Sequence, residues 1–346
     1  MNMNGKAAVS PASFTLKNDN GIEVTIISAG ASIRRLIVPD FYGKRENIVL
    51  SFKDEKLYFN NPLYAGAILG PVAGRISDGR LSLCGTVFQL TRNDGANHLH
   101  GGKNSLSFLN WQLQSQGQNP DTGESVLVFQ ASLPDGTDGF PGNRHFIASY
   151  SLNRENQLTL VYEVVSDKDT YFNLSNHSYF NLSGDFTESA LNQELLIDAE
   201  QYVANNEEHL PIGFEPVGHT PFDFRTPHTL AAHMEAYPKH PQLLNALGYN
   251  NGFALSTPKA TLFHKKSGRC MELTTNAPCI VLYSGGYIPK GLPLADSFFS
   301  SPSCAIALEA QDFPNAPNCP AFAFSFTKAH EVYRRLIQYR FFIAKP

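Results

Sequence analysis

Three short segments place a titratable side chain among small polar residues and turn formers. They are residues 97–102 (NHLHGG), 173–182 (NLSNHSYFNL) and 308–318 (LEAQDFPNAPN). Histidine suits proton transfer because its unperturbed pKa is about 6.5. A glutamate with an ordinary pKa of about 4.3 is ionised near pH 7 and can accept a proton. The segments therefore predict an acid–base site with His100, His177 and Glu309 as candidate residues.

His177 and Glu309 each have a structural interpretation beside the catalytic one. A lone histidine is often a hydrogen-bonded structural group, but the polar neighbours of His177 favour a function. Glu309 follows the apolar run 304–308, where a carboxylate is costly unless it is paired or useful. The alternative is a glutamate at the end of a strand that faces water. Asp312, in the proline-rich turn that follows, is expected to face solvent.

A metal site is the main alternative use of the same residues. On an extended strand, positions i and i+2 face the same side, so His98 and His100 could bind one cation. His177 and Glu309 would complete a set of three histidines and one carboxylate. The H-x-H pattern is common, however, and the other two ligands are distant in the sequence. An exposed or structurally bonded loop position is the simplest interpretation of His98.

The elements that must position these residues are predominantly β-strands. Segments rich in Val, Ile, Thr, Tyr and Phe predict strands at 22–28, 126–132, 146–152, 158–165, 304–308 and 322–326. Residues 80–90 predict a hairpin around Cys84-Gly85, and residues 229–237 are the best helix candidate. With 26 Gly and 22 Pro as punctuation, this favours a sandwich or barrel. Without an internal repeat or linker, a single β domain over 1–346 is expected.

Composition limits the partners and the compartment. The 346 residues are 42% hydrophobic and 17% charged, with a formal net charge of -4. Without a Lys/Arg cluster, nucleic acid and an anionic membrane surface are not expected partners. No run of about 18 apolar residues predicts a membrane span, and residues 1–11 lack the apolar region of a secretory signal. Five cysteines without a C-x-x-C pair favour a reduced, cytoplasmic setting.

Taken together and in order, the motifs resemble the aldose 1-epimerase (galactose mutarotase) family. The resemblance covers roughly residues 66–326, and NHSYFNL is its most specific motif. The family-like stretches are residues 70–76 (GPVAGRI), 97–102, 134–143 (PDGTDGFPGN), 173–182 and 309–318. It implies a large antiparallel β-sandwich with an open concave cleft, and an isomerase that interconverts the anomers of a free sugar.

The resemblance also implies the role of each site residue. His177 would protonate the ring oxygen as general acid, and Glu309 would take the proton from the anomeric hydroxyl as general base. His100 would bond the substrate near the reacting centre, and Arg75 would contact sugar hydroxyls. Ring opening changes no oxidation state, so neither a cofactor nor a metal is expected. The absence of G-x-G-x-x-G and P-loop patterns from the sequence agrees with that.

The sequence departs from the family pattern at positions that hold the sugar. Asn250 stands where the pattern G-x-D-H-x-F has an Asp, Val281 where a Gln usually precedes Y-T-G-N, and Gly74 where an Asn usually precedes the Arg. An Asn side chain still donates and accepts hydrogen bonds, but without charge. These departures keep a second alternative open, a non-catalytic sugar-binding or regulatory protein on the same fold.

Overall fold

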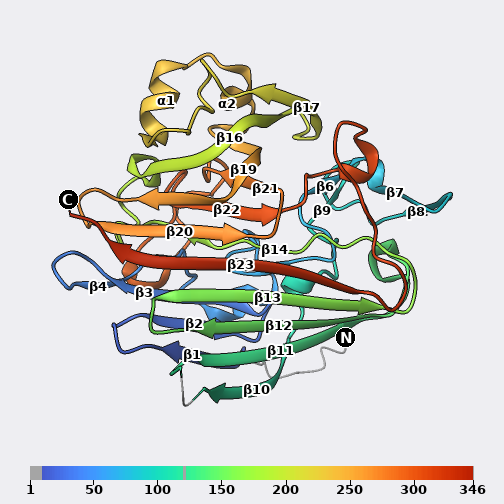
Figure 1. The fold of residues 1–346 in the computed structure, drawn as a ribbon, viewed down its shortest axis with the longest axis horizontal. Helices are drawn as coiled ribbons and strands as arrows, with labels where there is room; N and C mark the ends of the chain where they lie inside the picture. Colours follow the sequence, from blue (N-terminus) through green and yellow to red (C-terminus); the bar gives the residue numbers. More distant parts are fainter. Residues whose placement is uncertain (1–9, 120–121, 346) are drawn as a thin grey trace, which may run out of the picture.

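The chain folds into antiparallel sheets, and the computed structural model describes residues 10–119 and 122–345. Most of the segment 1–11, interpreted above as lacking a secretory signal, lies outside these residues. A 13-stranded sheet runs through the molecule (Figure 1), and every pairing between its strands in the described residues is antiparallel. Its main path follows the spatial order β10 (Gln112–Gln118), β11 (Ser125–Leu133), β12 (Arg144–Leu152), β13 (Gln157–Ser166), β23 (Val332–Ile343), β20 (Arg269–Thr275), β19 (Asn250–Phe263), β21 (Cys279–Tyr283), β22 (Ile306–Gln311), β15 (Tyr179–Phe180).

Smaller elements complete the architecture. β16 (Glu194–Asn205) pairs with β19 and carries β17 (Pro211–Pro216) and β18 (His228–Thr229). A four-stranded sheet has the order β1 (Ser13–Lys17), β2 (Glu23–Ile27), β3 (Ser32–Pro39), β4 (Arg45–Asn47). Three two-stranded pairs are β5 (Ile68–Leu69) with β14 (Ser175–Asn176), β6 (Arg75–Ile76) with β9 (His98–Leu99), and β7 (Arg80–Leu83) with β8 (Thr86–Gln89). The short helices α1 (Leu230–Ala236) and α2 (Pro241–Ala246) lie beside β16 and β17 (Figure 1).

The four-stranded sheet packs on β10–β13 through apolar side chains. Residues on β13 alternate between buried and partly exposed, as expected when one face covers a core. Phe14 meets Phe129 with ring centroids 5.5 Å apart, and the hydroxyl of Tyr150 donates to the carbonyl of Ala31. The only tryptophan, Trp111, is buried in the same core with its ring 6.5 Å from that of Phe146. The predicted all-β antiparallel sandwich is confirmed.

Most of the predicted elements are present at nearly their predicted positions. Strands β2, β11, β12, β13 and β22 overlap the predicted segments, and β7 and β8 form the predicted hairpin. Cys84 and Gly85 both have positive φ at its turn, as a type I′ turn requires. Helix α1 falls within 229–237, and the Thr229 side chain caps it by accepting from the Ala232 amide.

The strand predicted at 322–326 is wrong. This segment forms no strand, and its aromatic rings pack into two apolar clusters. Phe322 packs against Phe214 and Phe313, with ring centroids 4.9 and 5.0 Å away. A run of phenylalanines is apolar in either role, so its composition did not separate a strand from a buried loop.

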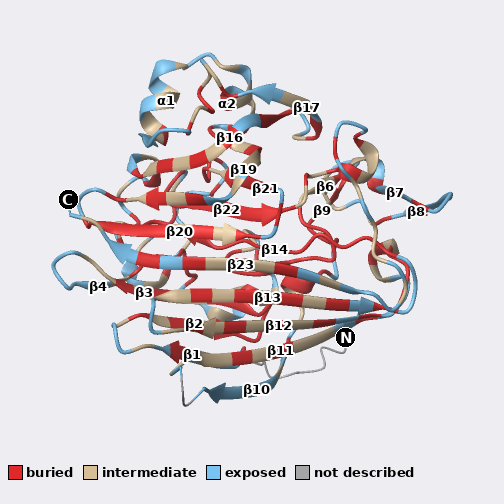
Figure 2. Ribbon diagram, viewed as in Figure 1, coloured by how far each residue is buried: buried red, intermediate tan, exposed pale blue. Residues whose placement is uncertain are grey.

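Strand β22 differs from its neighbours because it is buried throughout. Figure 2 shows β22 buried along its length, whereas β13 changes class from residue to residue. Its first half, residues 306–308, is apolar without alternation, as is typical of a strand covered on both faces. Glu309 lies in this strand, so the fold removes its carboxylate from water.

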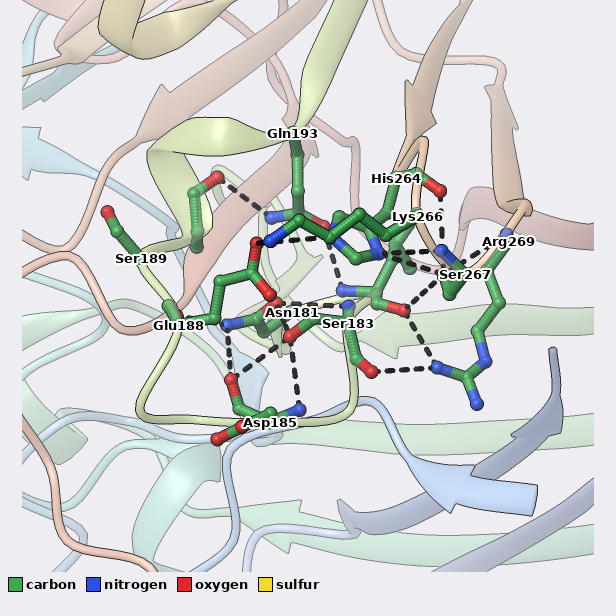
Figure 3. A network of polar contacts seen from close by, with 12 residues as sticks. Asn181, Ser183, Asp185, Glu188, Ser189, Gln193, His264, Lys266, Ser267 and Arg269 are labelled. Atoms are coloured by element: carbon green, nitrogen blue, oxygen red, sulfur yellow. Dashed lines mark hydrogen bonds and ion pairs between the residues drawn. The ribbon is translucent and has the colours of Figure 1, made fainter. Parts of the chain in front are cut away.

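A polar network, which we call the Arg269 clasp, fixes the segment that follows β15 (Figure 3). The Arg269 side chain is 1% exposed and donates to the carbonyl oxygens of Leu182 and Ser183 at 3.0 and 2.9 Å. It also pairs with Glu46 at 3.0 Å and donates to the Val38 carbonyl. The clasp therefore joins the chain just after β15 to strand β20 and to the four-stranded sheet.

Candidate active site

One cavity of about 250 Å³ brings together all five site residues named from the sequence. Arg75 lies on β6, His100 follows β9, His177 lies between β14 and β15, Asn250 begins β19, and Glu309 lies on β22. One water needs only about 15 Å³ on the same measure, so the cavity has room for a small organic molecule. The remaining question is how these side chains are held.

The backbone of His177 is bonded on both sides. Its amide donates to the carbonyl of Ala67 at 3.0 Å, and its carbonyl accepts from the amide of Gly66 at 2.9 Å. Gly66 has φ +69°, and a Cβ at this position would collide with the carbonyl of Ile33. Glycine is therefore required where the chain passes beneath the histidine.

The polar residues around His177 serve this backbone. The amide of Asn176 donates to the Gly66 carbonyl at 3.0 Å, and the Ser178 hydroxyl donates to the Asn176 side chain at 2.6 Å. Asn173 accepts from the Asp312 amide at 2.7 Å. The polar island that singled out His177 in the sequence is therefore a frame for the histidine.

The carboxylate of Glu309 lies directly against His177. Oε1 is 3.5 Å from Nε2 of His177, and Oε2 accepts from Nε2 of Gln311 at 3.2 Å. The alternative of a strand-end glutamate facing water is wrong, because β22 continues through Gln311 and Glu309 is 3% exposed. The expectation that Asp312 faces solvent is also wrong, because Asp312 forms a half-buried ion pair with Arg335 at 2.6 Å.

Burial shifts the pKa of both groups toward the neutral form. Removal from water raises the pKa of Glu309 to about 8, although the Arg75 charge and the Gln311 hydrogen bond oppose the shift. Burial lowers the pKa of His177 to about 4. Burial therefore moves the pKa of Glu309 above the ordinary value assumed from the sequence. Between these two values the pair holds one titratable proton.

His100 is held as a neutral hydrogen-bond donor. Its Nδ1 accepts from the amide of Gly74 at 3.1 Å, so its proton resides on Nε2. Burial, the nearby His177 and the Arg75 charge keep its pKa well below the usual range. The ring lies 5.6 Å from that of His177 and edge-on to Tyr64. His100 thus offers an uncharged N–H beside the His177–Glu309 pair.

The predicted face shared by His98 and His100 is wrong. Strand β9 ends at Leu99, and His100 has φ +49°, which turns its side chain away from the direction of His98. His98 is buried against Phe140 with Nδ1 2.7 Å from the Thr91 carbonyl, as a structurally bonded residue. Ligand atoms of His100, His177 and Glu309 do lie within 4.8 Å of one another and could geometrically hold a cation.

Arg75 and Asn250 line the cavity from two other sides. Nε of Arg75 donates to Asp94 at 2.7 Å, and this bond orients the guanidinium. The bond uses Nε and not the two terminal nitrogens of the guanidinium. The backbone carbonyl of Asn250 accepts from the Asn205 side chain at 2.8 Å. Gly74 and Val281, the other positions that depart from the family pattern, also line the cavity.

Several residues of the cavity were not singled out from the sequence. They are Tyr64, Asn205, His209, Tyr283, Tyr287 and Gln311. Gln311 could have been found, because position i+2 on a strand shares the face of Glu309. Asn205 and His209 could not, since their place depends on the long-range pairing of β16 with β19.

Comparisons with known proteins agree with this fold. The aldose 1-epimerase family model matches residues 12–340. A galactose mutarotase from Sus scrofa is 32% identical and covers 96% of this chain and 94% of its own. An aldose 1-epimerase from Escherichia coli K12 is 28% identical, covering 95% and 94%. The solved structure of a galactose 1-epimerase from Lactobacillus acidophilus has a TM-score of 0.85 and 28% identity over 99% and 98% of the two chains.

The antiparallel sandwich and these matches define a sugar isomerase. The chain belongs to the aldose 1-epimerase family. The sequence-based prediction of the family and of a mutarotase is confirmed. Among the described residues, the structure contains no helix long and apolar enough to span a bilayer.

Proposed function

We propose that this cavity interconverts the α and β anomers of a free, neutral aldose, with His177 as general acid and Glu309 as general base. The observation that carries the proposal is the buried contact of 3.5 Å between Nε2 of His177 and Oε1 of Glu309. The curated relatives are called galactose mutarotase and aldose 1-epimerase, which supports the same reaction here.

An adjacent pair fits the chemistry of ring opening. Both oxygens that exchange protons, O1 and the ring oxygen, are bonded to the same carbon C1. Glu309 takes the proton from O1, the C1–O1 bond becomes a carbonyl, and the bond from C1 to the ring oxygen breaks. His177 then protonates the released oxygen. Because the two oxygens are geminal, the acid and the base must be neighbouring groups.

The single proton of the pair accounts for reversibility. In the free pair these pKa values place the proton on Glu309, and ring opening starts from the form in which that proton has moved to His177 and Glu309 is a carboxylate. After ring opening, His177 is neutral and Glu309 holds the proton taken from O1. Rotation about C1–C2 and the reverse transfer then give the other anomer. Burial disfavours the charged form of each group, so it opposes full charge separation in the first state and assists proton transfer.

The other residues are proposed to bind the sugar. His100 donates from Nε2 to an oxygen near C1, and Arg75 donates to sugar hydroxyls from its terminal nitrogens. Asn250 exchanges hydrogen bonds with a hydroxyl at the rim. We also propose a cytoplasmic location without a nucleic-acid or membrane partner, which is supported by five cysteines without a disulfide and a net charge of -4.

Polarimetry of mutarotation across a set of free aldoses tests the function. We expect the protein to accelerate the approach to anomeric equilibrium for at least one of them. Binding of an aldose without any acceleration would instead indicate the sugar-binding alternative.

The same assay after exhaustive chelation tests the metal alternative. We expect unchanged rates, because His177 and Glu309 suffice for both proton transfers, whereas loss of activity restored by zinc or manganese would contradict this mechanism.

A further inference from the structure

A row of apolar residues crosses the sheet beside Glu309. Val281 on β21 is the direct register partner of Glu309 on β22, and Gly252 on β19 is the partner of Val281. A Cβ placed on Gly252 would lie 3.2 Å from the side chain of Val203 on β16. All four residues line the cavity. We call Val281, Gly252 and Val203 the apolar strip.

The apolar strip offers a hydroxyl no partner from its backbone. Strand β21 is paired with β19 on one edge and with β22 on the other, so its N–H and C=O groups bond within the sheet. Val203 and Val281 also belong to an apolar cluster that contains Cys279 and Phe313. The strip is the part of this apolar cluster that lines the cavity.

Two polar side chains on β21 and β22 already hold hydrogen bonds. The amide of Gln311 donates to Glu309 at 3.2 Å and accepts from the Asn173 side chain at 3.3 Å. The hydroxyl of Tyr283 accepts from the backbone amide of Tyr287 at 3.0 Å. Val281 itself offers neither a donor nor an acceptor, so a hydroxyl held directly above it would lose part of its hydration without a partner from that side chain, which is unfavourable.

We propose that Val281 is a specificity-determining residue and that the substrate is a deoxy aldose, with a carbon-bound hydrogen above Val281 where an ordinary aldose has a hydroxyl. Residues directly opposite in an antiparallel pair have Cβ atoms about 5 Å apart. The group above Val281 is therefore close to the C1 that Glu309 serves, on the same sugar. This inference rests on the proposed function and adds the class of sugar.

The test compares substrates and variants in one matrix. We first choose the aldose that turns over fastest, or the one that binds most tightly if none turns over. This aldose is then compared with each of its monodeoxy derivatives. Each sugar is assayed by polarimetric kcat/KM and by calorimetric Kd. The proteins are the parent, Val281→Thr, which adds a hydroxyl at nearly constant shape, and Val165→Thr as control. Val165 is 37% exposed on β13 and is not among the residues that line the cavity.

We expect one deoxy position to be preferred by the parent, about 10–100-fold, because an apolar wall discriminates against a hydroxyl by up to about that factor. In Val281→Thr this preference should fall about tenfold, while in Val165→Thr it should not change. The decisive quantity is the ratio of the value for the deoxy sugar to the value for its parent aldose. If this ratio is the same in the parent protein and in Val281→Thr, for kcat/KM and for Kd alike, the inference is overturned. If no aldose is turned over, the proposed function fails instead, and the Kd ratios still decide the role of Val281.

Discussion

At the scale of single residues, the proposed chemistry uses two side chains that the fold removes from water, Glu309 and His177. Glu309 and His177 would titrate near their ordinary pKa values on the surface. In the structure, burial raises the pKa of Glu309 and lowers that of His177, and their side chains are in contact at 3.5 Å. Three predictions follow from this arrangement and from its neighbour Arg75.

Replacement of Glu309 tests the base. Glu309→Gln keeps the shape and a hydrogen bond to O1 but cannot accept a proton. We expect kcat to fall about 10²–10⁴-fold, with a much smaller change in substrate affinity. Glu163→Gln, at an exposed position of β13, is the matched control. Asp312→Asn would be a poor control because it breaks the half-buried ion pair with Arg335. Near-parental kcat for Glu309→Gln would remove the central residue of the mechanism.

The pH profile tests the shared proton. Below pH about 4 both His177 and Glu309 hold a proton, so no base remains. Above pH about 8 the pair has lost its proton, so no acid remains. We expect kcat/KM of the free enzyme to form a plateau between these limbs, which belong to the pair and not to either residue. A profile with its alkaline limb near pH 4–5, as for an ordinary carboxyl group, would contradict the assignment.

Arg75 sets the position of the alkaline limb. Its positive charge lowers the pKa of Glu309, so its removal should raise that pKa and move the limb to higher pH. Arg75→Met should show this displacement in kcat/KM against pH, in addition to any loss of sugar binding. The surface variant Arg334→Met should leave the limb in place, since the Arg334 side chain is 63% exposed. An unmoved limb in Arg75→Met would show that the charge does not reach Glu309.

At the scale of elements, the sequence predicted the strands better than their neighbours in space. The alternating residues of β12 and β13 predict these strands directly. The pair Cys84-Gly85 predicts the turn of the hairpin formed by β7 and β8. The segment 322–326 is rich in phenylalanine, as many strands are, but it forms no strand and its rings pack into apolar clusters. Helix α2 was not predicted because it is only six residues long, although Pro241 at its first turn is a typical start.

The Arg269 clasp makes a prediction for stability. Arg269→Met would leave Glu46 and the carbonyl oxygens of Val38, Leu182 and Ser183 without this donor in a buried region. We expect the free energy of unfolding, measured by urea denaturation, to fall by about 3–5 kcal/mol.

Two further variants delimit this effect. Arg269→Lys should recover only part of the stability, because a single ammonium cannot reach all of the oxygen acceptors that the guanidinium fork contacts. Arg334→Met should change stability by no more than about 0.5 kcal/mol, as is usual on the surface. A loss in Arg269→Met as small as that of Arg334→Met would mean that the clasp does not stabilise the fold.

At the scale of the whole molecule, the C-terminal strand joins the halves of the large sheet. β23 pairs with β13 on one side and with β20 on the other, and one apolar cluster includes residues from both parts. We propose that the chain is a single domain, as the sequence predicts over 1–346. Calorimetric unfolding should then show one transition with equal calorimetric and van't Hoff enthalpies. Two separated transitions would contradict this.

The site could be predicted from the sequence only in part, and the reason lies at this larger scale. Arg75, His100, His177, Asn250 and Glu309 were named, and all five line one cavity. The burial that shifts the pKa of Glu309 is a property of the assembled sheets. The direction of His100 depends on one positive φ, which the sequence does not specify. The part of the cavity lining that holds Val203 and Asn205 depends on how β16 pairs with β19.

The single tryptophan gives the molecule a built-in optical probe of its core. Trp111 is buried against Phe146 and is not among the residues that line the cavity, where the aromatic side chains are tyrosines and histidines. Its fluorescence should therefore report unfolding of the sandwich and remain constant while a sugar fills the cavity. A change in its emission during a sugar titration would mean that ligand binding is felt through the sheet, between the two layers of the sandwich.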